Sequence, residues 1–271
     1  MQKVIYNYQI AIYNNDRIIN LIIKKEEGQM ATKKVEEVII RPIERKITSL
    51  TIVGDSPLIM HAWDIKSKRQ MLMSQLKWEK TKQHEAKNPM ADFISSMYWL
   101  TPMPEEMTEE SFINATANGA RFGFPVTAFK QAAISAAYRM GWTKDKVSAR
   151  GAFFINPSVE FYYGGEMFLD EKQKDIQIIP NRRIYSQMVE IESDDPIPRE
   201  DMVRVGMGSA DIRYRGEFRN WSAKLEIQYN ANGNFSLEQI INMINAGGYV
   251  CGVGEWRPEK DGQYGMFHVV A

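Results

Sequence analysis

The sequence is poor in cysteine and histidine, and its charges cancel: it has one cysteine, Cys251, three histidines, and 34 basic against 34 acidic residues. A single cysteine excludes an intramolecular disulfide and fits a reducing compartment. Balanced charge excludes a polycationic tail protein, although a locally basic groove remains compatible with it. No apolar run approaches the stretch of about 20 residues that spans a membrane, and no cleavable signal peptide is evident. We therefore expect a cytoplasmic protein with no membrane partner.

Short motifs for catalysis and for cofactors are also missing. The sequence has no P-loop, nucleophile elbow or dinucleotide fingerprint, and the G-V-G of residues 252–254 lacks the helix start of a phosphate-binding glycine loop. The histidines His61, His84 and His268 do not have metal-ligand spacing. We therefore expect no cofactor, no metal and no catalytic residue, and a binding protein rather than an enzyme.

The composition is that of a globular domain, with 44% hydrophobic and 25% charged residues. Residues 30–271 suffice for one large domain. Residues 1–29 are poor in Ala and Gly and rich in Ile, Asn and Tyr, and Met30 opens a segment typical of a bacterial start. We expect residues 1–29 to be translated leader sequence or a flexible N-terminal extension. The alternative is a β-hairpin with its turn at residues 14–16.

A strand and a helix are predicted in the first half of the domain. Residues 47–53 alternate between the two faces of a strand and stop at Gly54, which begins a turn. A helix is predicted from Thr127, a candidate N-cap, to Met140, with Gly141 as its C-terminal stop.

A second strand and helix are predicted in the C-terminal part. Residues 221–229 alternate strictly between apolar and polar side chains. Ser236 and Gln239 form an S-x-x-Q capping box, and the helix that it opens is predicted to end at the Gly247–Gly248 pair. Further strands are predicted at residues 152–155, 159–163, 176–179, 249–253 and 266–270.

A strand, a helix and a strand thus follow one another twice, which is the pattern of a split βαβ fold. We predict an α+β protein with a ferredoxin-like, RRM-like core. Inserted lobes are expected at about residues 64–120 and 156–212. Residues 190–201 are acidic and contain two prolines, which predicts an exposed connection.

Three segments carry a resemblance to a known superfamily. They are L-T-I-V-G-D-S-P-L-I-M at residues 50–60, F-P-V-T-A-F-K-Q-A-A-I-S-A-A-Y-R-M at residues 124–140, and the G-x-G of residues 252–254 with the Y-G-x-F of residues 264–267. With these segments in this order, the chain resembles the RAMP proteins, especially the backbone subunits that polymerise along guide RNA in CRISPR effector complexes. Residues 126–128 replace the family's usual Gly-Ser-Ser, so the chain resembles a divergent relative, for which a phage origin is one explanation.

The resemblance implies a function and a first set of site residues. It implies that several copies bind single-stranded nucleic acid, with RNA as the first candidate and DNA as the second, and contact other effector subunits. Carried over by position, Lys130 would touch backbone phosphate, and Gly252, Gly254, Trp256 and Arg257 would lie on a loop beside the strand. The plainer alternatives are that Lys130 lies on a solvated helix face and that Trp256 covers the core.

The residues themselves suggest a second set. Between residues 121 and 150, six basic residues, Arg139 among them, face a single acid. Further along, Arg213, Tyr214, Arg215 and Arg219 combine charge for phosphates with planes for base stacking. We predict that alanine at both Arg213 and Arg215 weakens binding and changes the melting temperature little.

Two other functions stay open. A metal-dependent nuclease on the same core would use Asp64 and His61, with Asp55 as a second candidate, because some relatives in the superfamily cut RNA with an aspartate after the first strand or with a histidine. A phage assembly or CRISPR-interfering protein would act through protein partners and show little salt-sensitive affinity for free RNA.

Overall fold

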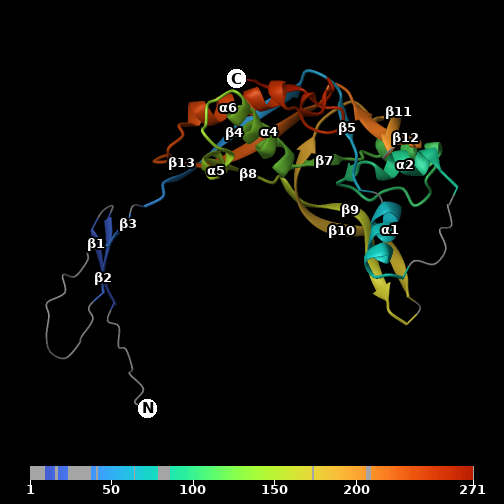
Figure 1. Ribbon diagram of the computed structural model, residues 1–271, viewed down its shortest axis with the longest axis horizontal. Coiled ribbons are helices and arrows are strands. Elements are labelled where there is room, and N and C mark those ends of the chain that lie inside the picture. The colour runs from blue at the N-terminus through green and yellow to red at the C-terminus, as the bar shows by residue number, and fades with distance from the viewer. Residues whose placement is uncertain are drawn as a thin grey trace, which may run out of the picture.

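The structure is a computed structural model (Figure 1). It describes residues 10–15, 18–23, 38–40, 42–63, 65–78, 86–172, 174–205 and 209–270. Asp64 and His84, two residues considered above, lie outside these ranges. Among the described helices, none is long and apolar enough to cross a membrane.

The N-terminal segment contains a small antiparallel sheet. β1 (Ile10–Asn15) pairs with β2 (Ile18–Ile23), which in turn pairs with β3 (Val38–Ile40). The hairpin expected as the alternative for residues 1–29 is therefore present in their described part. The leader interpretation concerns translation, and it stays a prediction.

A four-stranded sheet forms the centre of the fold. In spatial order its strands are β14 (Phe267–Val270), β4 (Arg45–Gly54), β13 (Ser222–Asn230) and β8 (Phe153–Asn156). Every pairing among them is antiparallel. The predicted strands at residues 47–53, 221–229 and 266–270 are confirmed, and together with the helices they make the protein α+β.

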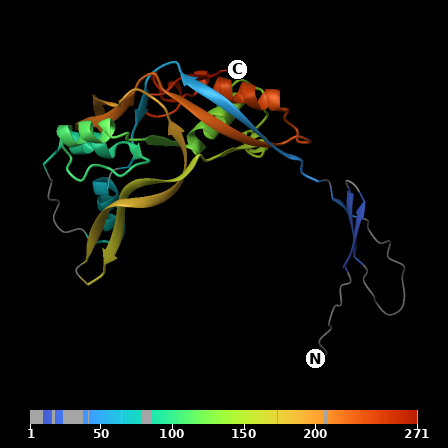
Figure 2. The ribbon, with the colours of Figure 1, turned by 180° about the vertical axis from the view of Figure 1, so that it is seen from behind.

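Two helices cover one face of this sheet. α4 (Val126–Arg139) and α6 (Leu237–Val250) lie in front of the sheet in Figure 1 and behind it in Figure 2. Toward them, β13 presents Ala223, Leu225 and Ile227, which are all buried. The opposite face is exposed, as Lys224 on the same strand illustrates. The alternation predicted for residues 221–229 is therefore confirmed.

The C-terminal helix is longer than its sequence predicted. Its capping box at Ser236 and Gln239 is present, but α6 continues through Gly247 and Gly248 to Val250. The predicted strand at residues 249–253 is therefore wrong. The two glycines allow close packing instead: a Cβ on Gly247 would lie 2.7 Å from the backbone nitrogen of Ala133 on α4, and one on Gly248 would lie 1.8 Å from the carbonyl oxygen of Phe267.

The start of α4 also differs from its prediction by one residue. Pro125 is the N-cap, Val126 is the first helical residue, and Thr127 lies inside the helix. Proline fixes its own φ near the value seen here, −61°, and has no amide hydrogen to satisfy. Gly141, with φ of 72°, follows the end of the helix as predicted.

The remaining strands form two further units. β11 (Ile197–Val205), β12 (Ser209–Phe218) and β5 (Leu58–Met60) make a three-stranded sheet in that order. The exposed connection expected at residues 190–201 is thus partly wrong, because its second half begins β11. The other unit is a small closed barrel of β10 (Asp175–Ile191), β7 (Phe122–Pro125), β6 (Tyr98–Trp99) and β9 (Val159–Asp170).

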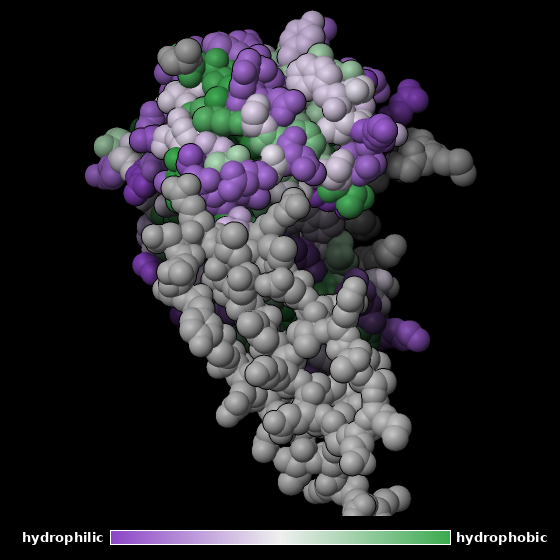
Figure 3. Space-filling view, turned by 90° about the vertical axis from the view of Figure 1, so that its left-hand side faces the viewer, coloured by the Kyte–Doolittle hydropathy of each residue, from purple (hydrophilic) through white to green (hydrophobic). Residues whose placement is uncertain are grey.

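Shorter helices complete the described chain. They are α1 (Ile65–Gln75), α2 (Pro89–Ser95), α3 (Glu109–Ala117), α5 (Lys146–Arg150) and the 3-10 helix η1 (Pro258–Lys260). β9 and β10 extend away from the central sheet as a long hairpin beside α1 (Figure 1). Polar and apolar residues are interspersed on the face shown in Figure 3, in keeping with the balanced composition.

Candidate nucleic-acid interface

A groove lies where α4 begins, and we call it the α4–loop groove. Its volume is about 270 Å³, and its walls come from the start of α4 (Thr127, Gln131), the C-terminal glycine-rich loop (Gly252, Gly254) and His61 after β5. These segments are far apart in sequence. They include parts of two of the three segments that carry the family resemblance, and the third, residues 50–60, adjoins the groove through β5.

The first turn of α4 forms part of the groove wall. Pro125, the N-cap, forms no side-chain hydrogen bond to the helix. The first amides of an α-helix have no partner within the helix, and the helix dipole adds a partial positive charge at this end. The wall formed by Thr127 and Ala128 therefore suits an anionic group.

The glycine-rich loop is held against β5 by its backbone. The Glu255 amide donates to the Ile59 carbonyl at 3.0 Å, and the Gly265 amide donates to the Pro57 carbonyl at 2.8 Å. Gly252 and Gly254 have φ of 63° and 79°. A Cβ on Gly254 would lie 2.6 Å from the Ile59 carbonyl oxygen, so this glycine is required by packing as well as by its place in the groove wall.

Trp256 and Arg257 have different positions on this loop. Arg257 lines the groove, where its Nη1 donates to the Gly254 carbonyl at 2.9 Å. It shares the Glu259 carboxylate with Arg139 of α4, since Glu259 lies 3.2 Å from Arg257 Nη2 and 3.1 Å from Arg139 Nη2. Trp256 is 38% exposed, has φ of 52°, and is not part of the groove wall. The structure thus brings Arg139 and Arg257 together.

Lys130 lies apart from these residues. Its ammonium is 4.0 Å from the centroid of the Phe154 ring and 5.8 Å from that of Phe153, both on β8. Burial lowers the pKa of this lysine. A cation over aromatic faces is stabilised by the ring quadrupoles, so in this structure Lys130 attaches α4 to the sheet edge.

The arginines of β12 belong to an ion-pair network with β11. Arg215 is only 4% exposed, and its Nη1 lies 3.1 Å from Asp201 Oδ2. Arg199 bridges the same two strands, with Nε 2.8 Å from Asp201 Oδ1 and Nη1 2.9 Å from Glu217 Oε2. The side chain of Arg219, 60% exposed, reaches Glu217 Oε1 at 2.8 Å. An arginine as buried as Arg215 contributes to stability, so its replacement is now expected to lower the melting temperature.

Sequence reasoning missed the acidic half of this network. Asp201 and Glu217 are both buried, and each stands two residues from an arginine on its own strand. On paired strands this spacing places opposite charges on one face. The signal is therefore present in the sequence, but the exposed connection predicted for residues 190–201 includes the beginning of β11.

Arg213 and Tyr214 of β12 do not line the α4–loop groove but another cavity. Arg213 Nε is 2.7 Å from Asp211 Oδ2, and the Tyr214 ring is half-buried with the Lys87 ammonium 6.0 Å from its centroid. The predicted residues thus fall into separate places. Gly252, Gly254 and Arg257 line the α4–loop groove, and Arg139 contacts Glu259 of its wall from the C-terminal end of α4. Arg213 and Tyr214 line a second cavity described below, and Lys130 lies against β8.

His61 and Glu255 connect the groove to the ion-pair network. His61 Nδ1 lies 3.8 Å from Glu255 Oε1, and Arg215 Nη2 lies 3.4 Å from Glu255 Oε2. His61 and then Arg215 hold the pKa of the Glu255 carboxyl below its ordinary value. On the same wall, burial raises the pKa of Tyr98 to about 12, so this phenol stays protonated as a hydrogen-bond donor.

The lowered pKa of Glu255 predicts how stability depends on pH. The stabilisation from its charge is fully present above the ordinary glutamate pKa of about 4.3, and it is lost as pH falls through the lowered value. We expect Glu255→Gln to be less stable than wild type near neutral pH and the two to converge in acid, as followed by urea unfolding across pH. Glu160→Gln, at an exposed carboxyl on β9, is the control. Parallel curves for Glu255→Gln and wild type would contradict this account.

The structure gives no support to a metal centre in the part of the chain that it describes. No group of three or more His, Cys, Asp or Glu residues there could hold a metal ion. Asp55 instead contacts His268, with Oδ1 2.6 Å from Nδ1, and Asp64 lies outside the described residues. Burial raises the pKa of the Cys251 thiol, which keeps it in the unreactive form.

No protein-family model and no curated protein matches this chain.

Proposed function

We propose that this protein binds single-stranded nucleic acid, with RNA as the first candidate, and that several copies assemble along the strand as the backbone subunits of CRISPR effector complexes do. One observation carries the proposal. The helix and the glycine-rich loop that resemble RAMP segments, although more than 100 residues apart, form opposite walls of one groove, beside the strand β5 that ends the remaining segment.

The chemistry of the groove supports an anionic ligand. The open first turn of α4 offers amide donors to a phosphate. The two carboxylates of the groove wall are both paired with arginine: Glu255 with Arg215, and Glu259 with Arg139 and Arg257. A polyanion therefore meets no uncompensated negative charge on these two residues.

We further propose that the central sheet with α4 and α6 is a ferredoxin-like core. Along the chain its elements run β4, α4, β8, β13, α6 and β14, which is a strand, a helix, two strands, a helix and a strand. The spatial order β14-β4-β13-β8 places the first and third of these strands at the centre. This connectivity supports a split βαβ arrangement.

The β9–β10 hairpin supports assembly of several copies. Phe168, Leu169, Ile178 and Ile179, near its end, are all more than a third exposed. Clustered exposed apolar side chains on a projecting element commonly mark a protein contact. By the strand register, Phe168 and Ile179 share one face of the hairpin and Leu169 and Ile178 the other, so a second copy packed against one face would bury one of these pairs.

The proposal is tested by fluorescence anisotropy with labelled single-stranded RNA and DNA at two salt concentrations, with sizing of the complexes. We expect salt-sensitive binding and complexes that grow with strand length. Gln131→Glu places a negative charge at the groove and should weaken binding roughly fivefold or more, because like charges 4 Å apart repel by about 1 kcal/mol even in bulk water.

The control is Asn234→Asp in the exposed loop between β13 and α6, which adds the same charge away from both the groove and the β9–β10 hairpin and should bind as wild type does. Absence of binding to either nucleic acid would refute the proposal and move the function to a protein partner. Cleavage of the RNA that depends on added Mg²⁺ would favour the nuclease alternative.

A further inference from the structure

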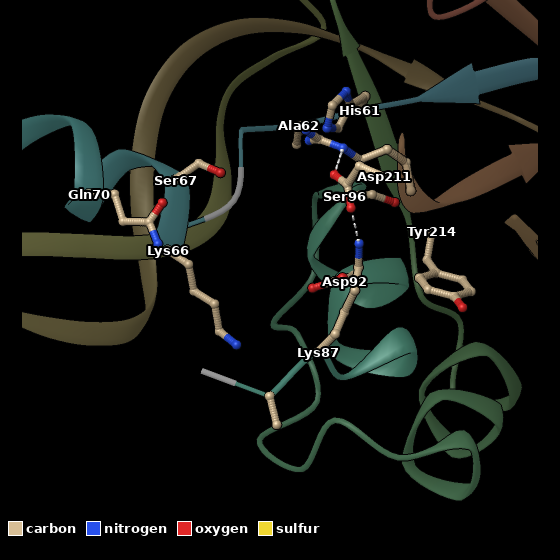
Figure 4. Close-up of a pocket in the computed structure, with 12 residues that line it drawn as sticks. His61, Ala62, Lys66, Ser67, Gln70, Lys87, Asp92, Ser96, Asp211 and Tyr214 are labelled. Atoms are coloured by element: carbon tan, nitrogen blue, oxygen red, sulfur yellow. Dashed lines mark hydrogen bonds and ion pairs between the residues drawn. The ribbon is translucent and has the colours of Figure 1, made fainter. Parts of the chain in front are cut away.

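A second cavity, which we call the α1–α2 cavity, lies beside the groove and has a volume of about 330 Å³ (Figure 4). Lys66 comes from α1, Lys87 and Asp92 come from the start of α2 or the residues before it, and Asp211 and Arg213 come from β12. His61 lines both this cavity and the α4–loop groove. The two hollows therefore adjoin at one residue.

The charges of the α1–α2 cavity favour an anion. Its lining has three cationic side chains, Lys66, Lys87 and Arg213, and two carboxylates. One of these carboxylates, Asp211, lies between two of the cations, with Lys87 Nζ at 2.8 Å and Arg213 Nε at 2.7 Å (Figure 4). One acid thus compensates only part of the charge of its two neighbours.

Two of the cations meet at Asp211, and the third, Lys66, lines the same cavity from α1. Lys87 is held at the cavity by Asp211 and by a hydrogen bond to the Ile212 carbonyl. In Figure 4 the ammonium of Lys66 extends from α1 toward the α2 side of the cavity. Ser67 and Gln70 of the same α1 turn and Ser96 of α2 add neutral hydrogen-bonding groups to the wall. Such a mixture suits a polar, charged ligand.

We infer that the α1–α2 cavity binds the phosphate ester of one nucleotide, with Lys66, Lys87 and Arg213 around the phosphate. This inference rests on the proposed function, in which the strand leaves the α4–loop groove past His61 and places its next phosphodiester here. The same chemistry would also accept a free mononucleotide. The volume is sufficient for one nucleotide unit and the polar wall matches its phosphate and sugar.

The test replaces two of the cations and keeps their side-chain stems. The double variant Lys66→Gln, Lys87→Gln is compared with Lys46→Gln, Lys144→Gln, which removes two exposed charges that lie outside this cavity. Each protein is titrated with labelled single-stranded RNA at several salt concentrations, and with uridine monophosphate and uridine followed by NMR. Circular dichroism checks that each variant is folded.

We expect the slope of log K against log salt to fall by up to about 0.7 in the cavity variant, because both lysines are placed on one phosphate, and to stay unchanged in the control. Uridine monophosphate should bind wild type and lose at least tenfold in affinity in the cavity variant, and uridine should not bind. Binding of RNA with the same slope in both double variants, together with equal uridine monophosphate affinity, would overturn the inference and leave the proposed function standing.

The experiment also distinguishes failure of the proposed function from failure of the phosphate site. If wild type binds no RNA but binds uridine monophosphate in a way that requires Lys66 and Lys87, the phosphate site is supported with a free nucleotide as its ligand, and the proposed function fails. This arm uses NMR on the folded protein, so it gives a result even where strand binding is absent.

Discussion

Replacing Asp201 by alanine should lower the free energy of unfolding by about 3 to 5 kcal/mol. The Asp201 carboxylate lies 3.1 Å from Arg215 Nη1 and 2.8 Å from Arg199 Nε, and the side chains of Asp201 and Arg215 are only 6% and 5% exposed. Without this acid, the buried Arg215 guanidinium keeps only longer contacts, with Glu255 at 3.4 Å and with His61 Nδ1 at 3.5 Å. Urea unfolding of the purified protein measures the change.

Two further variants show whether the loss of stability in Asp201→Ala comes from the burial of the ion pair. Glu44→Ala removes an exposed pair with Lys46, at 3.2 Å, and should cost at most about 1 kcal/mol. The combination of Asp201→Leu with Arg215→Met removes both buried charges together and should recover much of the stability lost in Asp201→Ala, since apolar replacements of buried ion pairs are often neutral. An Asp201→Ala protein no less stable than Glu44→Ala would show that the network contributes little.

Replacing Gly265 by alanine should be the most damaging single methyl addition in the glycine-rich loop. Gly265 has φ of 64°, and a Cβ there would lie 1.7 Å from the carbonyl oxygen of Val253. That oxygen belongs to the backbone, and Val253 donates its own amide to the Gly265 carbonyl at 2.9 Å, so no side-chain rotation relieves the clash. We expect a loss of more than about 2 kcal/mol, the upper end of the left-handed backbone cost alone.

Gly141→Ala separates the backbone cost of a positive φ from the steric cost of the added methyl group. Gly141 also has a positive φ, 72°, but nothing lies within 4 Å of the Cβ that would be added. Its cost should be the backbone term alone, about 1 to 2 kcal/mol. The excess for Gly265→Ala over Gly141→Ala, measured by thermal and urea unfolding, is the steric term. Equal losses in the two variants would show that the loop relaxes around the new methyl group.

Local patterns predicted the elements of the central sheet well. The strand at β13 followed from strict alternation, and the start of α6 followed from the capping box at Ser236 and Gln239. The capping box depends on contacts within a few residues, and the alternation depends on one buried face, so both can be recognised in the sequence. The end of α6 could not be predicted in this way. Gly247 and Gly248 normally favour the end of a helix, and only their close contact with α4 and β14 explains why α6 continues.

The candidate site was predicted in part. The sequence identified the helix start and the loop with Gly252, Gly254 and Arg257, which the structure brings to one groove. It also grouped Arg213, Arg215 and Arg219 as one surface, whereas the structure buries Arg215 and pairs it with Asp201. Pairing depends on which strands are neighbours, and β11 was not recognised as a strand.

The sequence by itself determined the α+β class, the strands and helices of the central sheet, and the absence of an intramolecular disulfide, because these depend on periodicity, capping and composition. Only the tertiary structure decided which charges are available to a ligand. Arg215 was assigned to the interface by its charge, yet its contacts with Asp201 and Glu255 come from segments 14 and 40 residues away in the numbering, joined by strand pairing and by the fold of the glycine-rich loop. Charge is a property of a residue, but its compensation is a property of the neighbours that folding supplies.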